Sequence, residues 1–302
     1  MIDNVFPPKA KWGVDDIPDL TGKVMIVTGS NTGIGKETVK ALLNHNAKVY
    51  MACRSKTKAE AAIAQLKEET GKAAIYIHLD LMDLRSIKVT AEELESRLDV
   101  LFNNAGIMFP PIDDLTKDGY DAQFGTNVIG HFFLTKLLLP VLLATAQTSP
   151  EHTARVINTS SFGHTGVSKL DFDTMRDGPA RRKLGRYQLY SQSKFGNIVF
   201  SNELARRYGK DGIVSVSLHP GMLKTDLANN ASFFKAMVGW TLYPAPMGAL
   251  TQLYAGTTPD AAALNGKYLK PWARIGKARK ETDDPETARR LWEWLEEQVK
   301  DV

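Results

Sequence analysis

A tyrosine and a lysine four residues apart, Tyr190 and Lys194, are the side chains in this sequence best suited to proton transfer. On a helix, residues i and i+4 lie on one face, one turn apart. A lysine ammonium beside a phenol stabilises the phenolate, so it should lower the tyrosine pKa from about 10 towards neutrality. Such a tyrosine can exchange a proton with a substrate oxygen at ordinary pH. Taken alone, the pair is more often simply one face of a helix, so its meaning depends on the rest of the sequence.

A glycine-rich loop follows the first apolar run, residues 24–28, and leads into an expected helix. Glycines stand at 29, 33 and 35, where they let the backbone turn tightly and approach a phosphate closely. The start of the helix offers free N–H groups to a pyrophosphate. The spacing G-x-x-x-G-x-G differs from the general G-x-G-x-x-G fingerprint. Its position between first strand and first helix nevertheless predicts a dinucleotide site rather than a simple turn.

The second apolar run, residues 48–52, ends in a basic segment. Sites for NAD place an acid there to bind the ribose 2′-hydroxyl. This chain has Arg54 instead and no acid between residues 51 and 56, and a guanidinium suits a 2′-phosphate. Lys56 and Lys58 could assist, although a solvated basic loop is the simpler interpretation of both. We therefore predict that NADP(H) is preferred over NAD(H).

The next two strands end in residues that suit the rest of a dinucleotide. Asp80 follows the third strand, where its carboxylate could accept a hydrogen bond from an adenine amino group. Ala105 and Gly106 follow the fourth strand, and their small size would let a ribose lie against the strand end. Both positions belong to the carboxyl edge of a doubly wound sheet, where such ligands bind.

Apolar runs alternate with helical patterns, which predicts an α/β fold with parallel strands. We expect a single-domain Rossmann-type doubly wound sheet of about seven parallel strands, with helices on both faces. The predicted strands are 24–28, 48–52, 74–78, 99–102, 155–159, 214–218 and 266–269. The predicted helices lie near 33–45, 57–70, 84–97, 119–147, 187–208 and 247–256, with a C-terminal helix at about 285–300.

The domain organisation follows from this pattern. Residues 1–20 are predicted to be an N-terminal extension, and 21–302 a single dinucleotide-binding domain. Two long stretches, 162–186 and 222–246, show no periodicity, and long loops in compact domains are often functional. The aromatic and apolar content of 222–246 favours a substrate loop for a hydrophobic ligand. Core packing and contact with a membrane surface are the alternatives.

Composition and charge exclude several classes of protein. Of 302 residues, 43% are hydrophobic and 24% are charged, as in ordinary globular chains. The net charge of +4 is small and dispersed, so we predict no nucleic-acid partner. Cys53 is the only cysteine, so no disulfide forms within the chain, in keeping with a reducing compartment.

The sequence does not indicate a membrane protein. Residues 1–20 hold adjacent prolines at 7 and 8 and several acids, and they lack the apolar core of a signal peptide. The longest apolar stretch, 137–146, is interrupted by Pro140 and is far shorter than the roughly 20 residues that span a bilayer. We therefore expect a cytoplasmic protein without stable membrane insertion.

Two other enzyme classes are disfavoured. The six histidines form no metal-ligand spacing, so we predict no metal site. No serine lies in the G-x-S-x-G sequence of a hydrolase nucleophile.

Six motifs in order resemble the short-chain dehydrogenase/reductase family, over about residues 20–270. They are Thr28-Gly29-x-x-x-Gly33-x-Gly35, Asn103-Asn-Ala-Gly106, Asn127, Thr159-Ser-Ser161, Tyr190-x-x-x-Lys194 and His219-Pro-Gly221. Segments 29–37 and 52–55, and the long stretch before Tyr190, look most like the retinol-dehydrogenase and WW-domain-oxidoreductase branch. This stretch is longer than in compact family members, and it could shape the entrance for the substrate.

The resemblance implies a catalytic group of four residues. Tyr190 would be the acid/base, and Lys194 would lower its pKa and hydrogen-bond the nicotinamide ribose. Ser161 would hold the substrate oxygen, with Ser160 as the rival serine. Asn127 would anchor a water that links Lys194 to solvent. Tyr187 is the rival tyrosine, but no lysine follows it four residues on.

The resemblance further implies a reaction and a set of cofactor contacts. The enzyme would interconvert a hydrophobic aldehyde or ketone and its alcohol by hydride transfer. The alternative is a non-catalytic, redox-sensing dinucleotide-binding regulator, although such relatives often lose the tyrosine or the lysine. A homodimer through helix 119–147 is left open. The implied cofactor-binding residues are Gly29, Asn31, Thr32, Gly33, Ile34, Gly35, Arg54, Asp80, Leu81, Asn104, Ala105, Gly106, Tyr190, Lys194, Pro220, Gly221 and Thr225.

Overall fold

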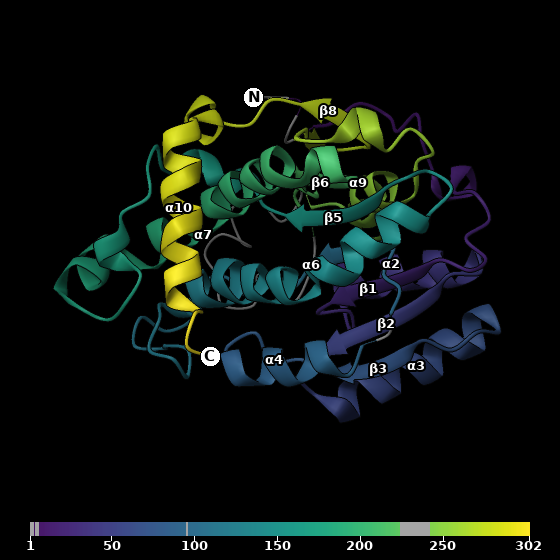
Figure 1. Ribbon diagram of the computed structural model, residues 1–302, viewed down its shortest axis with the longest axis horizontal. Helices are drawn as coiled ribbons and strands as arrows, with labels where there is room; N and C mark the ends of the chain where they lie inside the picture. The colour runs from purple at the N-terminus through teal and green to yellow at the C-terminus, as the bar shows by residue number, and fades with distance from the viewer. Residues whose placement is uncertain (1–2, 4–5, 95, 224–241) are drawn as a thin grey trace.

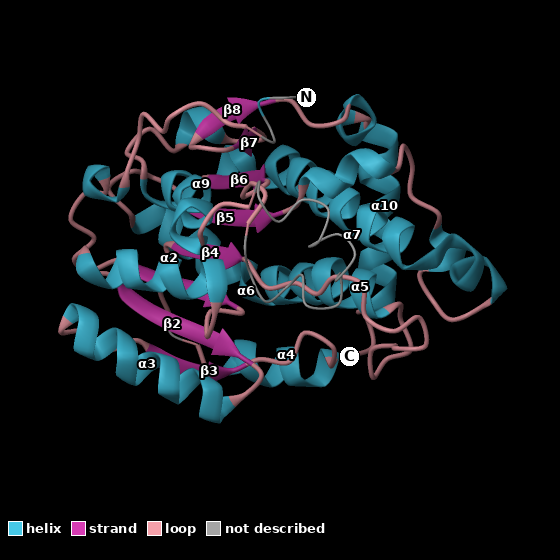
Figure 2. Cartoon of the chain, turned by 180° about the vertical axis from the view of Figure 1, so that it is seen from behind, coloured by secondary structure: helices cyan, strands magenta, loops and turns pink. Residues whose placement is uncertain are grey.

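A computed structural model of the chain describes residues 3, 6–94, 96–223 and 242–302 (Figure 1). Within these residues, one eight-stranded sheet has the order β3-β2-β1-β4-β5-β6-β7-β8 and carries helices on both faces (Figure 2). The strands are β1 (Val24–Thr28), β2 (Lys48–Cys53), β3 (Ile75–His78), β4 (Val100–Asn103), β5 (Ala154–Thr159), β6 (Ile213–Leu218), β7 (Tyr268–Lys270) and β8 (Arg274–Gly276).

The predicted doubly wound α/β fold is confirmed, with one strand more than expected. Strands β1 to β7 pair in parallel, whereas β8 pairs antiparallel with β7 at the sheet edge. The sequence analysis missed β8 because its three residues form no apolar run. The winding direction reverses between β1 and β4, so the carboxyl ends of these two strands border the crevice where such folds bind ligands.

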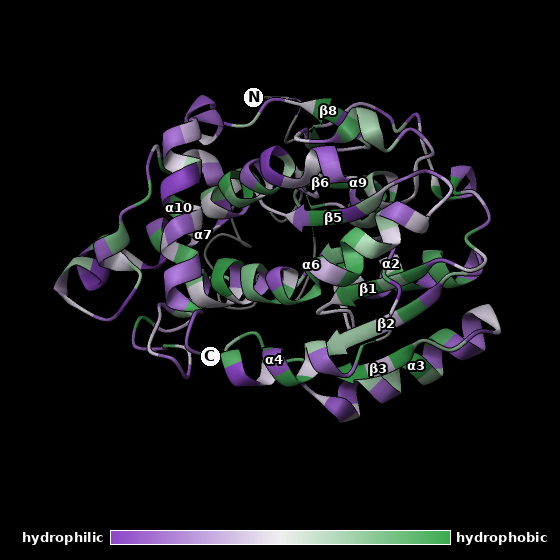
Figure 3. Cartoon of the chain, viewed as in Figure 1, coloured by the Kyte–Doolittle hydropathy of each residue, from purple (hydrophilic) through white to green (hydrophobic). Residues whose placement is uncertain are grey.

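The helices divide between the two faces of the sheet. They are α2 (Gly33–Asn44), α3 (Lys56–Thr70), α4 (Leu84–Glu92), α5 (Ala122–Phe124), α6 (Gly130–Thr148), α7 (Pro179–Tyr208), α9 (Ala245–Thr257) and α10 (Pro285–Gln298). Helices α2, α3 and α9 enclose one buried apolar cluster, and α4, α6 and α7 enclose the other, with α10 packed across α7 (Figure 1). Hydrophobic residues are concentrated in the strands and in α6 (Figure 3).

Single helical turns complete the described elements. The 3-10 turns are η1 (Val14–Asp16), η3 (Phe162–Gly166), η4 (Phe172–Thr174), η5 (Gly209–Asp211), η8 (Ala262–Leu264) and η9 (Lys280–Asp283), and η2 (Gly125–Ile129) is a π-helical turn.

The helix predicted at 119–147 is present, but a π turn interrupts it. Helices α5 and α6 continue one another through η2, which carries Asn127. Turns of this type occur mostly as local bulges, often at functional sites. The span Ala122–Thr148 is long and apolar enough to cross a membrane, yet 67% of its most apolar window is buried in the fold. A mostly buried core helix can have the same length and apolar composition, so these two properties are weak evidence for a membrane span.

Helix α7 begins earlier than the sequence analysis predicted. We expected a non-periodic stretch up to residue 186, but helical structure starts at Pro179. Proline suits the first helical position, because its missing N–H would have no partner there. Gly185 then leaves the helical conformation, with φ of 78°, and the long C-terminal part follows it. Because Gly185 interrupts the helical periodicity, the sequence pattern did not indicate the first part of the helix.

The two ends of the chain contribute to the fold differently. Ile17 and Leu20 of the predicted N-terminal extension are buried, and the Leu20 N–H donates to the His45 carbonyl oxygen at 2.7 Å. The predicted C-terminal helix is present as α10, with the Asp284 carboxylate accepting the Thr287 N–H at its start. The proposed boundary at residue 20 stays a prediction, and most of the predicted substrate loop, 224–241, lies outside the described residues.

A buried ion pair joins the start of α7 to α5. Arg181 Nε donates to Asp121 Oδ2 at 3.0 Å, and these side chains are only 1% and 2% exposed. Arg181 also donates from Nη2 to the carbonyl oxygen of Asp114 at 2.9 Å. The other Asp121 oxygen caps α5 by accepting the N–H groups of Gln123 and Phe124. One carboxylate thus organises both helix starts.

Replacing Arg181 by methionine should lower the free energy of unfolding by about 3–5 kcal/mol, because the Asp121 carboxylate would stay buried without its cation. Equilibrium unfolding in urea measures this change. Arg182→Met is the matched control, because Arg182 is 49% exposed and pairs with Asp113 and Asp177 at the surface. Its loss should stay below about 1 kcal/mol. Equal losses in the two variants would contradict the importance of the buried pair.

Candidate active site

The glycine loop after β1 forms a tight cradle at the start of α2. Gly29 has φ of +63°, and a Cβ there would lie 2.8 Å from the Cβ of Ala105. At Gly35 a Cβ would lie 2.7 Å from the carbonyl oxygen of Gly29. Thr32, the N-cap, makes no side-chain hydrogen bond to the helix start in the described chain. The N–H groups of the first turn are therefore available to an anion such as a pyrophosphate.

The Thr28 hydroxyl connects this loop to the end of β4. Its oxygen accepts the backbone N–H groups of Asn104 at 3.0 Å and Ala105 at 2.9 Å. Asn104 returns a bond from Nδ2 to the Thr28 carbonyl oxygen at 2.8 Å. Two neighbouring strand ends are thereby fixed to one another at the crevice.

The same hydroxyl reaches the π turn through a buried histidine. His131 Nε2 lies 2.9 Å from Thr28 Oγ1, and Nδ1 lies 3.1 Å from the Asn127 carbonyl oxygen. A carbonyl oxygen can only accept, so Nδ1 carries the proton and Nε2 accepts from Thr28. Burial lowers the pKa of His131 to about 4, so the ring stays neutral. The sequence analysis missed this residue, because its Thr28 partner lies in a distant segment of the chain.

Arg54 and Asp80 lie at the same edge of the sheet. The Gly29 N–H donates to the carbonyl oxygen of Ala52 at 2.9 Å, which joins the glycine loop to the end of β2 just before Arg54. Arg54 is exposed, and its Nη1 lies 3.8 Å from Met82 Sδ. Asp80 Oδ1 accepts the Met82 N–H at 3.0 Å. Met82 thus contacts both predicted cofactor residues, which follow different strands.

Gly106 joins the predicted cofactor residues to the predicted catalytic residues. A Cβ at this position would lie 3.2 Å from Asn127 Oδ1 and 3.4 Å from Lys194 Nζ. A larger residue would therefore crowd both polar groups. The absence of a side chain lets the Gly106 backbone approach both groups closely, and the ribose contact expected at 105 and 106 stays a prediction.

Tyr190 and Ser161 meet through their side chains. Ser161 follows β5, and Tyr190 lies on α7, where it is 6% exposed. Burial raises the pKa of Tyr190 to about 12, although a hydrogen bond from the Ser161 side chain opposes this shift. Ser161 Oγ also accepts the Gly163 N–H at 3.0 Å. The phenol and the serine hydroxyl can therefore face one substrate oxygen together.

The expected lowering of the tyrosine pKa by Lys194 is wrong for this structure. Lys194 Nζ lies 6.0 Å from the centre of the Tyr190 ring and donates to the Thr159 carbonyl oxygen at 2.9 Å. Burial lowers the pKa of Lys194 to about 7. Removal from water thus disfavours the charged form of both groups.

The rival serine has a structural contact of its own. Ser160 Oγ donates to the Lys194 carbonyl oxygen at 2.6 Å, and the residue is 2% exposed. This bond ties the end of β5 to α7. Ser161, not Ser160, contacts Tyr190, in agreement with the serine chosen from the sequence, although its catalytic role stays a prediction.

Asn127 is held by the backbone of the β4 loop. Its side chain donates to the Ile107 carbonyl oxygen at 3.1 Å and accepts the Ile107 N–H at 2.9 Å. Its own carbonyl oxygen accepts from Asn197 Nδ2 at 2.6 Å as well as from His131. The predicted water anchor therefore already has two protein donors, and that role stays a prediction.

The remaining predicted cofactor residues lie around this centre or outside the described chain. Leu81 is buried, and its carbonyl oxygen would lie 2.7 Å from a Cβ at Gly130. Gly221 follows β6 with φ of +97°, and its N–H donates to His219 Nδ1 at 3.2 Å. Thr225 lies outside the described residues. Asn31, Ile34 and Pro220 are all partly buried, and the Ile34 carbonyl oxygen accepts the Thr38 hydroxyl at 2.8 Å.

Two further residues near the centre escaped the sequence analysis. His164 accepts the Arg279 N–H at Nε2, so its Nδ1 donates to the Ser161 carbonyl oxygen at 2.7 Å. Gln123 is buried and accepts the Phe109 N–H at 2.9 Å. A histidine three residues after Ser161 was the available signal for the first, whereas nothing in the sequence marked the second.

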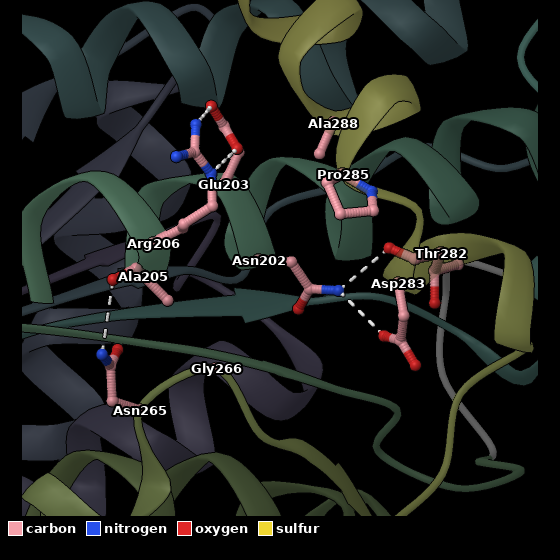
Figure 4. A pocket seen from close by; sticks show the side chains of 10 residues that line it. All are labelled: Asn202, Glu203, Ala205, Arg206, Asn265, Gly266, Thr282, Asp283, Pro285 and Ala288. Carbon is pink, nitrogen blue, oxygen red and sulfur yellow. Dashed lines mark hydrogen bonds and ion pairs between the residues drawn. The ribbon is translucent and has the colours of Figure 1, made fainter.

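Other polar clusters of the described chain do not resemble this site. A surface pocket of about 370 Å³ lies between α7 and α10, but Asn202 there donates to Thr282 and Asp283, and Glu203 binds Arg206 (Figure 4). None of the predicted site residues lines it. Among the described residues, no three His, Cys, Asp or Glu side chains are grouped to hold a metal ion.

Comparison with known proteins identifies the family. A family model described as short chain dehydrogenase matches residues 23–169. A short-chain dehydrogenase/reductase of Armillaria gallica is 60% identical over 305 residues, covering 100% of this chain and 98% of that protein. One from Phomopsis amygdali is 41% identical over 323 residues, covering 98% of this chain and 95% of that protein.

Solved structures agree with this result. A protein from Mycobacterium paratuberculosis has a TM-score of 0.75 and 31% identity, covering 96% of this chain and 98% of that chain. The complex of Pseudomonas aeruginosa RhlG with NADP has a TM-score of 0.66 and 24% identity, covering 84% and 96%. At 24% identity, the similarity to RhlG shows the fold alone.

The chain therefore belongs to the short-chain dehydrogenase/reductase family. It is an oxidoreductase that acts on CH–OH groups and their carbonyl counterparts, and its fold binds a nicotinamide dinucleotide. The cradle at Gly29 and Gly35, which side chains at these positions would fill, fits the pyrophosphate of such a ligand. The similarity to the retinol-dehydrogenase branch stays a prediction.

The lowered pKa of Lys194 should appear in the pH dependence of stability. Between pH 7.5 and 9.5 the unfolded lysine, with its ordinary pKa, binds a proton that the folded lysine, with a pKa of about 7, does not. The unfolding free energy of the apoprotein, relative to that of Lys194→Met, should therefore rise by roughly 1 kcal/mol per pH unit. Urea unfolding at several pH values measures it. Lys169→Met, at an exposed site, should show no such difference, and a difference between wild type and Lys194→Met that stays constant with pH would refute the shift.

Proposed function

We propose that this enzyme prefers NADP(H) and interconverts a hydrophobic aldehyde or ketone and its alcohol. One observation carries the proposal: the Tyr190 side chain is hydrogen-bonded to the Ser161 side chain, and Lys194 lies one turn further along the helix. The Lys194 Nζ lies beside Gly106, just after the end of a strand that borders the dinucleotide loop. A proton donor and a hydride carrier could thus meet at one carbonyl group.

The proton step uses residues of this chain. In reduction, the Tyr190 hydroxyl donates its proton to the carbonyl oxygen, and the Ser161 hydroxyl hydrogen-bonds the same oxygen. A bound nicotinamide supplies or accepts the hydride. A pKa of about 12 keeps the phenol protonated at neutral pH, as a proton donor must be. In the reverse reaction, the alcohol hydroxyl returns this proton to the Tyr190 phenolate.

Lys194 is assigned two roles in this proposal. Its Nζ donates to the Thr159 carbonyl oxygen and lies close to Gly106, where we place the ribose. From there it could hydrogen-bond a ribose hydroxyl. As an ammonium it would also favour the phenolate during alcohol oxidation. Its pKa of about 7 means that both protonation states are populated near neutral pH.

The preference for NADP(H) is supported by the charge at the end of β2. Arg54 is exposed at the carboxyl edge, and Lys58 on the following turn adds a second exposed cation. The segment 51–58 contains no acid that could bind a ribose 2′-hydroxyl. A guanidinium offers several donors to a phosphate in a fixed planar arrangement.

Of the remaining expectations, the alternative function is disfavoured and the others stay predictions. A regulator without turnover is disfavoured because the chain has Tyr190, Lys194 and Ser161 in mutual proximity, which redox sensing alone does not require. A cytoplasmic location, a homodimer, the absence of nucleic-acid partners and the absence of membrane insertion stay predictions. So does the role of the loop 222–246 in binding a hydrophobic substrate.

Tyr190→Phe should lower kcat for carbonyl reduction by about 10²–10⁴-fold, because the ring remains but the proton donor is lost. NADPH consumption at saturating substrate gives kcat, and fluorescence titration gives the Kd of NADPH, which should change less than about twofold. The control is Tyr208→Phe, about 27 Å further along α7 by helical rise. A near-normal kcat in Tyr190→Phe would rule out this assignment.

Arg54→Ala should change cofactor preference. Loss of a charge-assisted hydrogen bond to the 2′-phosphate should reduce kcat/KM for NADPH by about 10–100-fold, while kcat/KM for NADH stays within about twofold. Steady-state kinetics with both cofactors measures the ratio. Lys58→Ala tests the neighbouring cation, for which we expect little change. If the NADPH to NADH ratio is the same in Arg54→Ala and wild type, the proposed preference is wrong.

A further inference from the structure

Phe109 has a backbone conformation that bulky side chains rarely adopt. Its φ is +55°, in the left-handed region where residues other than glycine are strained. The surrounding chain holds it there by hydrogen bonds. The Phe109 N–H donates to Gln123 Oε1 at 2.9 Å, and its carbonyl oxygen accepts from Arg186 Nη1 at 3.3 Å. Strain of this kind is found where the surrounding structure fixes a functional position.

Gln123 completes this arrangement from the protein interior. Its Nε2 donates to the Arg186 carbonyl oxygen at 2.9 Å, and the residue is 1% exposed. The β4 loop and the start of the main part of α7 are therefore held together through one buried amide. The two hydrogen bonds that Phe109 itself makes involve only its backbone, so they position its ring without using its side chain.

The Phe109 ring lies between two tyrosines of α7. It meets Tyr190 edge to face, with ring centres 5.4 Å apart and planes at 71°. It meets Tyr187 with centres 5.9 Å apart and planes at 36°. Tyr187 is 56% exposed, and it lies three residues before Tyr190, on the same side of the helix. We call Phe109, Tyr187 and Tyr190 the aromatic wall.

Glycines on the η3 turn fix the two tyrosine rings from the other direction. A Cβ at Gly163 would lie 3.1 Å from Tyr190 Cε1, and one at Gly166 would lie 3.5 Å from Tyr187 Cε1. The backbone of this turn, which starts just after Ser161, therefore packs directly on both rings. A wall that is rigid before binding costs little conformational entropy when a ligand contacts it.

We infer that the aromatic wall selects carbonyl substrates in which an aromatic ring is joined directly to the carbonyl carbon. The inference rests on the proposed function, because that function places the carbonyl oxygen at the Tyr190 hydroxyl. A ring on the carbonyl carbon then lies beside the wall. Aromatic rings gain from edge-to-face and offset contacts beyond their buried area, whereas a saturated ring of similar size gains only the area.

Matched substrate pairs test this inference in the holoenzyme. The pairs are benzaldehyde with cyclohexanecarbaldehyde, and acetophenone with cyclohexyl methyl ketone. The measured quantity is the ratio of kcat/KM, aromatic over saturated, in each variant divided by that in wild type, so the intrinsic reactivity of each carbonyl cancels. Phe109→Leu and Tyr187→Leu should each lower this ratio about threefold to tenfold, mainly through KM of the aromatic substrate.

Conservative variants separate the ring from the fold. Phe109→Tyr and Tyr187→Phe keep an aromatic ring and should keep the wild-type ratio. Phe109→Asn should fold at least as stably as wild type, because asparagine tolerates the left-handed conformation, and yet it should lose the preference. An unchanged ratio in Phe109→Leu, Tyr187→Leu and Phe109→Asn would overturn the inference, as would equal losses on aromatic and saturated substrates.

A binding measurement distinguishes this inference from the proposed function. If no carbonyl compound is turned over with either cofactor, the proposed function fails. Saturation-transfer NMR with benzyl alcohol and cyclohexylmethanol then decides the inference on its own. Stronger binding of benzyl alcohol that Phe109→Leu abolishes would support the wall, and equal binding of the two alcohols to wild type would overturn it.

Discussion

The hydroxyl of Thr28 is the contact on which the geometry of this site depends. It accepts two backbone N–H groups from the end of β4 and bonds to His131, which in turn bonds to the Asn127 carbonyl oxygen. The glycine loop, the strand end beside Lys194 and the π turn are therefore fixed relative to one another by one buried oxygen. Dinucleotide binding and proton transfer belong to different segments of the chain, and this link sets the distance between them.

Burial determines the electrostatics of the same centre. Tyr190 and Lys194 are both almost fully enclosed, and enclosure disfavours phenolate and ammonium alike, so the pKa of Tyr190 rises while the pKa of Lys194 falls. The neutral forms are favoured, and no strong ion pair has to be broken before a proton moves. A hydrogen bond between the Ser161 and Tyr190 side chains opposes the rise in the Tyr190 pKa. The site therefore combines a protonated donor with a base close to neutrality.

The sequence predicted those features that depend on neighbouring residues. Apolar runs located β1 to β7, and the spacing of Tyr190 and Lys194 located the centre, because side-chain periodicity is a local property. The direction of the tyrosine pKa shift was wrong, because burial depends on residues far away in the chain. His131 and Gln123 were missed for the same reason, since their partners lie in other segments. Gly185 concealed the start of α7, and β8 was too short to form a pattern.

The hydrogen bonds that hold Phe109 involve only its main chain. The position can therefore accept another side chain while its hydrogen bonds to Gln123 and Arg186 are kept. Mutation at this position would change the shape of the entrance while the proton-transfer geometry persists. A chain built in this way can acquire new substrates by single substitutions, because the part that recognises the molecule is separable from the part that transforms it.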